Sequence, residues 1–207
     1  MVAGGLVRPG GRNARVPTRV VWALLVELGD RPFDTVTMSG LATRSGIARA
    51  TLHRRWGDPG AVLADAADDL LQRRMGRGIG TISRAAPDPR PSSTDLLVVH
   101  LRSLVTWLSR PETSAVLLAA MARTQHDDVL AVRTVGLWDH ELDDLRRVLS
   151  RTVPAATERD IERAAESLLG AVVVRVLLRH RPLAGPGVRQ LAENFIQELL
   201  WVCRRNA

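Results

Sequence analysis

Apolar residues recur every three or four positions along most of this 207-residue chain, and prolines stand where that spacing breaks. The spacing predicts helices over residues 18–28, 61–75, 94–109, 112–124, 127–150, 157–180 and 188–204, with Pro111, Pro154, Pro182 and Pro186 at or beside their ends. The sequence has no strand-like alternation, no Asn-Gly hairpin signal and no repeat of fixed period. We therefore expect an all-α fold.

The composition describes a folded chain with a core of its own. Hydrophobic residues make up 45% and charged residues 25%, and no apolar stretch approaches the roughly 18 residues of a membrane span. The first residues contain no continuous apolar segment of an export signal, so we expect a cytoplasmic protein without a membrane partner. A single cysteine, Cys203, excludes an internal disulfide and a cysteine zinc cluster.

Charge is concentrated near the start of the chain. All 29 basic residues are Arg, which excludes chemistry that depends on lysine, such as a Schiff base or a P-loop. Residues 1–60 contain nine Arg and four acidic residues, whereas residues 61–207 contain twenty Arg and eighteen acidic residues. This asymmetry indicates an N-terminal unit that meets a polyanion.

Residues 37–56 have the residue pattern of a helix-turn-helix. Thr37 is a good N-cap for a short helix, and Gly46 allows the positive φ that turns the chain into a second one. Leu52 and Trp56 lie four apart and form the buried stripe of the second helix. The outward residues of that helix are Arg49, Ala50, Thr51, His53, Arg54 and Arg55. A basic, outward-facing second helix is typical of DNA binding, and two ordinary helices with a charged face are the alternative.

The segment from Thr37 to Leu63 resembles the TetR family of transcriptional regulators. The resemblance rests on Thr37, Leu41-Ala42, Gly46-Ile47, Thr51-Leu52, Trp56 and Val62-Leu63. It implies a flexible Arg-rich arm at 1–13, a three-helix DNA-binding domain with a helix-turn-helix at 14–74, and a helical effector-binding and dimerisation domain at 75–207. The implied partners are double-stranded operator DNA, a second copy of the chain and an unknown small-molecule effector.

The resemblance also assigns DNA contacts residue by residue. It places Arg49, Ala50, Thr51 and Arg54 against the major groove. It places Thr37 and His53 near phosphates. The remaining candidate DNA contacts are Ser39, Arg44, Arg55, Arg12 and Arg15. Three residues depart from the family pattern: His53 replaces a Tyr, Pro59 replaces a Lys, and Ala48 replaces a Ser or Thr cap. Arg55 or Arg44 could compensate for these losses.

The last two predicted helices have apolar faces broader than one core requires, which indicates a homodimer interface. The candidate interface residues are Leu168, Val172, Val176, Leu191, Phe195, Leu199 and Val202. The resemblance places these helices in a four-helix interface, and a buried hairpin within a monomer is the alternative. A two-fold dimer would set two recognition helices about 34–36 Å apart on a near-palindromic operator.

The middle helices supply candidate walls for an effector pocket, although the same residues also fit an ordinary core. The candidates are His100, Leu104, Trp107, Met121, Gln125 and Trp138. A bound effector would favour a dimer geometry that no longer matches the groove spacing, so the chain is expected to be a ligand-released repressor.

Catalysis is not expected, and no cofactor or metal is implied. Residues 140–144 approach the zinc-protease motif His-Glu-x-x-His, but Asp144 occupies the fifth position, so we expect an ion pair with His140. Two other functions stay open. One is a helical interaction module whose basic face meets an acidic protein, and the other is a small metal-dependent enzyme near His140.

Overall fold

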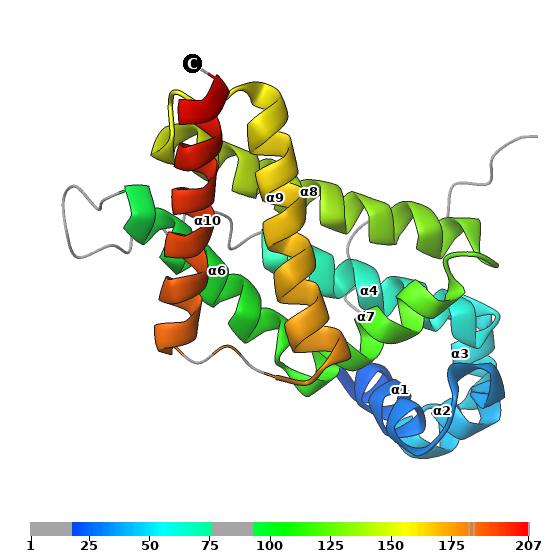
Figure 1. The fold of residues 1–207 in the computed structure, drawn as a ribbon. Helices are drawn as coiled ribbons and strands as arrows, with labels where there is room; N and C mark the ends of the chain where they lie inside the picture. The colour runs from blue at the N-terminus through cyan, green and yellow to red at the C-terminus, as the bar shows by residue number, and fades with distance from the viewer. Residues whose placement is uncertain (1–17, 76–92, 182, 184, 207) are drawn as a thin grey trace, which may run out of the picture.

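The computed structural model describes residues 18–75, 93–181, 183 and 185–206. These residues contain helices and no strand, which confirms the expected all-α class (Figure 1). The predicted arm at 1–13, the Gly-rich stretch at 76–80 and all but the last residue of the Pro-rich loop at 85–93 lie outside the described residues.

Three α-helices form the N-terminal unit. They are α1 (Thr18–Asp30), α2 (Met38–Ser45) and α3 (Arg49–Trp56), and the short 3₁₀ helix η1 (Phe33–Thr35) precedes α2. Leu24, Leu41 and Leu52 are fully buried where these helices meet. Trp22 on α1 is 54% exposed. The helix packs against α2, α4 and α7, and this leaves the side that carries Trp22 open.

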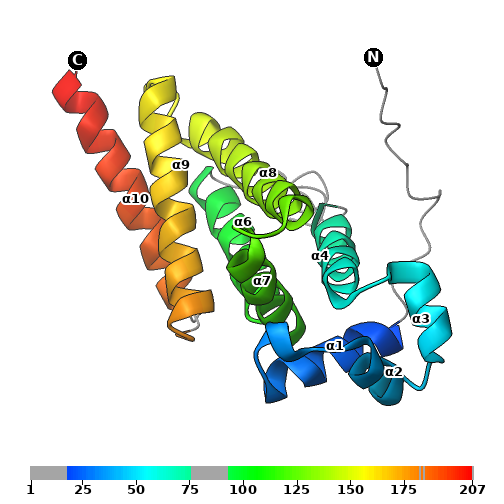
Figure 2. The ribbon, with the colours of Figure 1, turned by 90° about the vertical axis from the view of Figure 1, so that its right-hand side faces the viewer.

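Helix α4 (Pro59–Met75) belongs to both halves of the molecule. It starts three residues after α3 ends and packs along α7 and α8 (Figure 2). Val62, Leu63 and Leu70 are buried along it. A displacement at one end of this continuous helix can therefore reach the other end. The predicted domain boundary at 74/75 stays a prediction.

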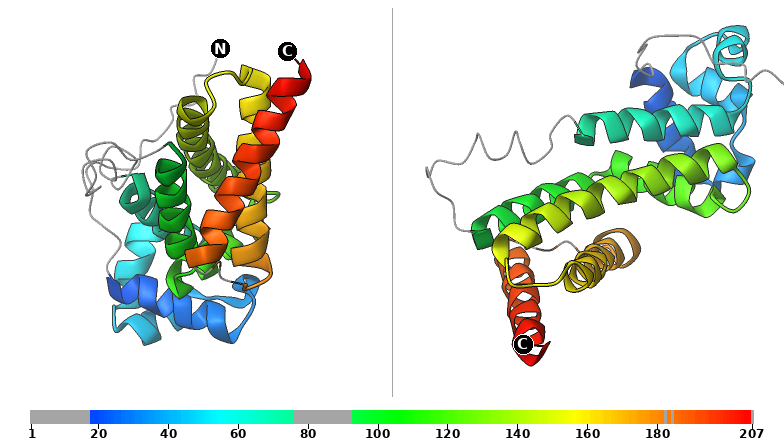
Figure 3. Two further views of the ribbon diagram at one scale, coloured as in Figure 1. Left: turned by 60° about the vertical axis from the view of Figure 1, so that its left-hand side comes forward. Right: turned by 90° about the horizontal axis from the view of Figure 1, so that it is seen from above.

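The rest of the chain forms the larger unit. Its helices are α6 (Ser93–Leu108), α7 (Pro111–Arg123), α8 (Asp128–Thr152), α9 (Glu158–Val173) and α10 (Gly185–Asn206). Seen from above in Figure 3, α9 and α10 lie on one side of the layer that contains α4, α6 and α8. Among the described residues, no helix is both long enough and apolar enough to cross a bilayer.

Two helix ends differ from the sequence prediction. The predicted helix at 157–180 is interrupted by a π-helical turn, η2 (Val174–Leu178), and His180 beyond it has a φ of 47°. The last helix begins at Gly185 rather than 188, so Pro186 lies in its first turn. Proline is tolerated there because the first N–H groups of a helix have no intrahelical partner. All other predicted ends agree within two residues.

Side-chain caps set several of these starts. The Asp127 carboxylate accepts hydrogen bonds from the N–H groups of Val129 and Leu130, and the Thr157 hydroxyl accepts one from Asp160. The predicted start of α8 beside His126 is confirmed. Each cap satisfies N–H groups that the helix itself leaves open.

Gly46 provides a direct test of the turn between α2 and α3. Its φ is +66°, and a Cβ added there would meet nothing within 4 Å. The cost of Gly46→Ala is therefore backbone strain alone, and we expect a loss of about 1–2 kcal/mol in the free energy of unfolding. Urea titration followed by circular dichroism measures it.

Gly136→Ala is the matched control. Gly136 lies inside α8, and a Cβ there also meets nothing within 4 Å. This change is expected to raise the free energy of unfolding by about 0.5–1 kcal/mol, because alanine loses less backbone entropy in a helix. Equal effects of the two substitutions would contradict the strain argument.

Candidate nucleic-acid interface

Helix α3 turns its predicted outer face to solvent. Leu52 and Trp56 are buried, and the Trp56 Nε1–H donates to an Asp65 carboxylate oxygen at 2.9 Å, which fixes α3 against α4. The exposed residues of α3 are Arg49, Ala50, Thr51, His53, Arg54 and Arg55. The helix therefore presents four basic or titratable side chains on a rigidly held rod.

The residues at the starts of α2 and α3 have the capping properties that the sequence predicted. The Thr37 hydroxyl accepts a hydrogen bond from the Gly40 N–H at 3.0 Å, which confirms the predicted N-cap of α2. Ala48 occupies the N-cap of α3 and provides no side-chain hydrogen bond. The sequence predicted this missing cap from the alanine. The positive end of the α3 dipole is therefore not compensated by a side chain of its own, which favours an approaching anion.

His53 organises the recognition helix from within. Its Nδ1 lies 2.8 Å from the Gly57 carbonyl oxygen, and its Nε2 lies 3.2 Å from the Arg49 Nε, which donates to it. A carbonyl can only accept, so Nδ1 carries the proton and Nε2 is the acceptor. Both ring nitrogens are thus occupied inside α3. The predicted phosphate contact of His53 would require one of these bonds to break, so His53 acts first as a support for Arg49.

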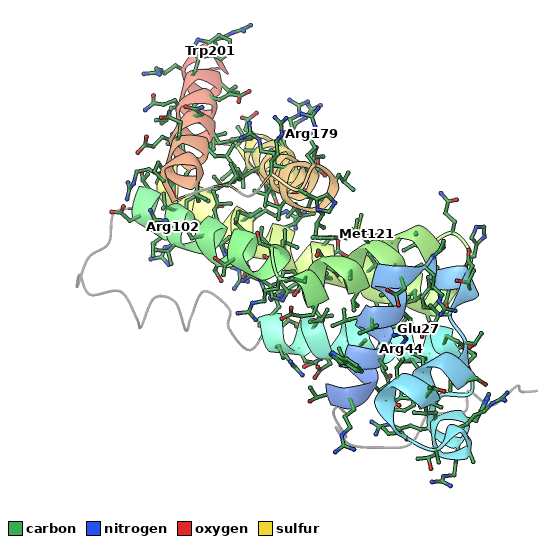
Figure 4. The ribbon with its side chains drawn as sticks, turned by 90° about the horizontal axis from the view of Figure 1, so that it is seen from below. Glu27, Arg44, Arg102, Met121, Arg179 and Trp201 are labelled. Atoms are coloured by element: carbon green, nitrogen blue, oxygen red, sulfur yellow. The ribbon has the colours of Figure 1, made fainter. Side chains whose placement is uncertain are left out.

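Arg44 faces α1 rather than solvent. Its guanidinium lies 2.5 Å from Glu27 and 2.6 Å from Asp30 (Figure 4). The hydrogen bond with Glu27 raises the pKa of Arg44. Because two carboxylates already balance its charge, Arg44 fixes α2 to α1 and is poorly placed to replace a missing phosphate contact.

Gly40, which has no side chain, leaves room for the Glu27 carboxylate between α1 and α2. A Cβ at Gly40 would lie 3.0 Å from Glu27 Oε1, tighter than nearly all real contacts. Glu27 is buried at the interface of α1 and α2 and also pairs with Arg31. In the sequence Glu27 stood out only as one of four acids near the start, and its place on the apolar stripe of α1 was the signal for this pairing.

The remaining predicted DNA contacts differ in their exposure and in their neighbours. Thr37 and Ser39 are exposed at the start of α2, and the Thr37 hydroxyl keeps its own hydrogen available to donate. The Arg55 guanidinium lies 4.5 Å from the centre of the Trp56 ring. Arg12 and Arg15 lie outside the described residues.

The six predicted pocket residues occupy different environments. His100, Leu104 and Trp107 are buried on α6, Met121 and Trp138 are half-buried, and Gln125 is exposed. Of these, Trp107 lines a surface hollow. Leu104 packs in the core and Gln125 faces water, and an effector pocket lined by these six residues stays a prediction.

A buried polar cluster lies where α4 ends against α6 and α8. The Arg74 guanidinium donates to both oxygens of Glu141, at 2.6 and 2.9 Å, and to the Ser103 hydroxyl at 2.7 Å. The Glu141 carboxylate also lies 3.6 Å from His100 Nε2. Burial lowers the pKa of His100 to about 4, so this imidazole is neutral near pH 7.

This cluster was not predicted from the sequence, where Glu141 stood only in the imperfect zinc motif and Arg74 had no role. The signal in the sequence was that Arg74 and Glu141 are charged residues on apolar helix faces. They lie 67 residues apart, and the sequence alone does not indicate that they pair. The predicted ion pair is present as a 4.0 Å approach of His140 to Asp144. The described residues contain no group of three or more His, Cys, Asp or Glu that could hold a metal.

The predicted dimer helices have one apolar side outside the core. Leu168 and Val172 are fully buried within the chain, and Val176 and Leu199 nearly so, so these four have little surface to offer a second copy. Leu191, Phe195 and Val202 are half-buried on one flank of α10. Cys203 beside them is also half-buried.

A different stripe of the same helices is open. Its members follow alternating three- and four-residue steps and are Ala164, Ser167, Ala171, Val174 and Leu178. Val174 is 44% and Leu178 57% exposed. We call this set the α9 stripe. Ala164, Ser167 and Ala171 lie on α9, where their small side chains permit a close approach, and Val174 and Leu178 lie in the π-helical turn η2.

Comparisons with known proteins found transcriptional regulators of similar sequence and similar fold. No family model matches the chain. The HTH-type transcriptional regulator BetI of Agrobacterium fabrum is 26% identical over 177 residues, which cover 85% of this chain and 84% of BetI. A Pseudomonas aeruginosa PAO1 structure described as a transcriptional regulator superposes with a TM-score of 0.75 at 17% identity, covering 91% and 92% of the two chains.

Two further solved structures share the fold. A TetR-like transcriptional regulator from Rhodococcus sp. RHA1 gives a TM-score of 0.61 at 20% identity, covering 90% of this chain and 98% of that one. A regulator from Saccharomonospora viridis in complex with choline gives 0.68 at 15% identity, covering 87% and 94%. The similarity extends through both units in each case.

Proposed function

Since the chain has the fold of the TetR-family transcriptional regulators, as the resemblance of residues 37–63 indicated, we propose that it regulates transcription by binding operator DNA. The exposed, arginine-bearing α3 carries this proposal. Arginine donates in a planar fork that matches the acceptors of guanine in the major groove, and Arg49 is held for that purpose by His53. Such a protein works in the cytoplasm of a bacterial cell, where the DNA is.

Selection of bound sequences from random duplex DNA tests the proposal and yields the operator. We expect a near-palindromic sequence with half-sites one helical turn apart. Failure to retain any duplex at low salt, where electrostatic attraction is greatest, would reject DNA binding. Retention of an acidic protein instead would favour the interaction module.

Arg49→Ala is expected to relax sequence preference. Removing a bidentate hydrogen-bond pair to guanine costs about 1–3 kcal/mol of discrimination at that base pair. Gel-shift titration of the selected operator and of a variant changed at that pair measures it, and the ratio of the two affinities should fall. Arg159→Ala, which removes an exposed arginine from α9 rather than α3, is the control. An unchanged ratio in Arg49→Ala would remove Arg49 from the reading surface.

The proposed active form is a homodimer joined through α9 and α10. The α9 stripe and the half-buried flank of Leu191, Phe195 and Val202 are two apolar strips. The helices α9 and α10 that carry them lie at one edge of the molecule (Figure 2). Exposed apolar surface of this kind is costly in water and is removed when a second copy covers it. A two-fold axis through this face would hold both α3 helices on one duplex.

Leu178→Asp is expected to dissociate the dimer, because it introduces a charge into the apolar contact. Light scattering at micromolar concentration should give twice the chain mass for the natural protein and the chain mass for the variant. Trp22→Asp is the control, since Trp22 has a similar exposure, 54% against 57%, but lies on α1. A natural protein of single-chain mass would contradict the dimer.

We further propose that the regulator is a repressor released by a small-molecule effector. The Saccharomonospora viridis regulator, which shares this fold and was solved in complex with choline, supports a small-molecule ligand. The coupling route in this chain is α4, which is tied to α3 by Trp56 and Asp65 and to α8 by Arg74 and Glu141. An effector acts only if it binds the DNA-incompatible arrangement more tightly.

A further inference from the structure

A surface hollow of about 210 Å³ lies between the end of α4 and one face of α6. We call it the arginine hollow. Its lining residues are Arg74, Arg102, Ser103, Thr106, Trp107 and Arg110. Arg102 and Thr106 are spaced four residues apart on α6 and therefore project from one side of the helix, and Arg110 follows at the N-cap of α7 (Figure 4 labels Arg102).

The lining has an excess of positive charge. It contains three guanidinium groups, two hydroxyl groups and an indole, and no carboxylate. Glu141 balances Arg74, but Arg102 and Arg110 are exposed and have no acidic partner among the residues that the structure describes. A second hollow, lined by Asp143, Arg146, Glu158 and Glu162 among others, differs because acids outnumber the one arginine there.

Arg74 makes the floor of the arginine hollow rigid. Only 5% of its side chain is exposed, and Glu141 and Ser103 fix three of its five N–H donors. The guanidinium carbon lies 5.6 Å from the centre of the Trp107 ring. Two N–H donors on the terminal nitrogens are left over, and a planar guanidinium with paired donors is suited to a phosphate or carboxylate.

We infer that the arginine hollow binds a small organic anion through a phosphate or carboxylate group. Arg74 and the hydroxyls of Ser103 and Thr106 would orient the anionic group, and Arg102 and Arg110 would supply the neutralising charge. The volume lies below the roughly 300–1,000 Å³ of drug-sized pockets, so the ligand is compact.

The consequence for regulation rests on the proposed function. An anion on the two remaining donors of Arg74 adds a second negative group beside Glu141, and the repulsion between the two changes how the end of α4 sits against α8. Arg74 lies fifteen residues, or about 22 Å along α4, from Pro59, where α4 begins after α3. The anion is therefore expected to weaken DNA binding.

Isothermal titration of the full chain with pyrophosphate and, separately, with citrate tests the site at constant ionic strength. We expect one ion per chain for at least one of the two probes. The Arg102→Gln/Arg110→Gln variant should weaken binding about tenfold or more, since it removes two charged donors. The matched Arg159→Gln/Arg163→Gln variant removes two exposed arginines from α9 and should leave the affinity unchanged.

Each outcome decides between the alternatives. Binding of pyrophosphate alone identifies a phosphate ligand, and binding of citrate alone identifies a carboxylate. No binding at millimolar concentrations, or equal loss in both double variants, overturns the site. Because the titration contains no DNA, its result remains valid even if the chain binds no DNA duplex. Tight binding that leaves the affinity for the selected operator unchanged would overturn the regulatory step only.

Discussion

Replacing Glu141 with Gln is expected to lower the free energy of unfolding by about 3–5 kcal/mol, because it leaves Arg74 charged and unpaired in the interior. Glu141 is 1% and Arg74 5% exposed, and their two hydrogen bonds are a buried polar connection between α4 and α8. The amide keeps the shape of the carboxylate, so a change in packing contributes little. Denaturant unfolding followed by circular dichroism measures the effect.

Two further variants separate the buried charge from the ion pair. Glu162→Gln removes one partner of the exposed pair with Arg146, and we expect a far smaller change because water screens both charges there. The double variant Arg74→Met/Glu141→Leu should recover most of the stability that Glu141→Gln removes, since apolar replacement of a buried pair is often neutral. A double variant as unstable as the single one would show that the ion pair itself stabilises the fold.

Affinity for the selected operator is expected to fall about 10³–10⁵-fold between 50 and 200 mM salt, if a dimer neutralises about six to ten phosphates. Arg54 and Arg55 on α3, doubled in the dimer, would supply four of these contacts. Fluorescence anisotropy at a series of salt concentrations measures the slope of log affinity against log salt.

Arg54→Gln and Arg44→Gln distinguish an arginine that binds DNA from a structural one. The first should reduce the slope by about 0.9 for each phosphate that the variant no longer neutralises. The second should leave the slope unchanged, because Glu27 and Asp30 already balance the Arg44 charge in the free protein. A flat dependence on salt for the natural protein would contradict phosphate binding, and a reduced slope for Arg44→Gln would return that residue to the interface.

Local sequence was sufficient for the helix-turn-helix. The Thr37 cap, the positive φ of Gly46 and the buried pair Leu52 and Trp56 all follow from interactions within a few residues. The helix ends marked by proline and by the Asp127 and Thr157 caps are local in the same way. For such features the chemistry of neighbouring residues fixes the backbone whatever surrounds them.

Side-chain partners across helices were not predictable. Arg44, a candidate DNA contact, is bound to α1, and Arg74 of α4 pairs with Glu141 of α8. The predicted dimer residues Leu168 and Val172 are core, while Val174 and Leu178 of the α9 stripe are exposed. A helical periodicity tells which residues share a face, but the rotation of that face toward a neighbour depends on all the other helices.

The amino-acid sequence by itself determined an all-helical chain with a basic, glycine-jointed helix pair near its start, because period, caps and turn residues act over one or two turns. Only the tertiary structure decided that α4 is fixed at both ends, that Arg74 and Glu141 meet in the interior, and that three arginines share one hollow. These arrangements join residues far apart in the chain, and their energy arises only after packing has removed water from between them.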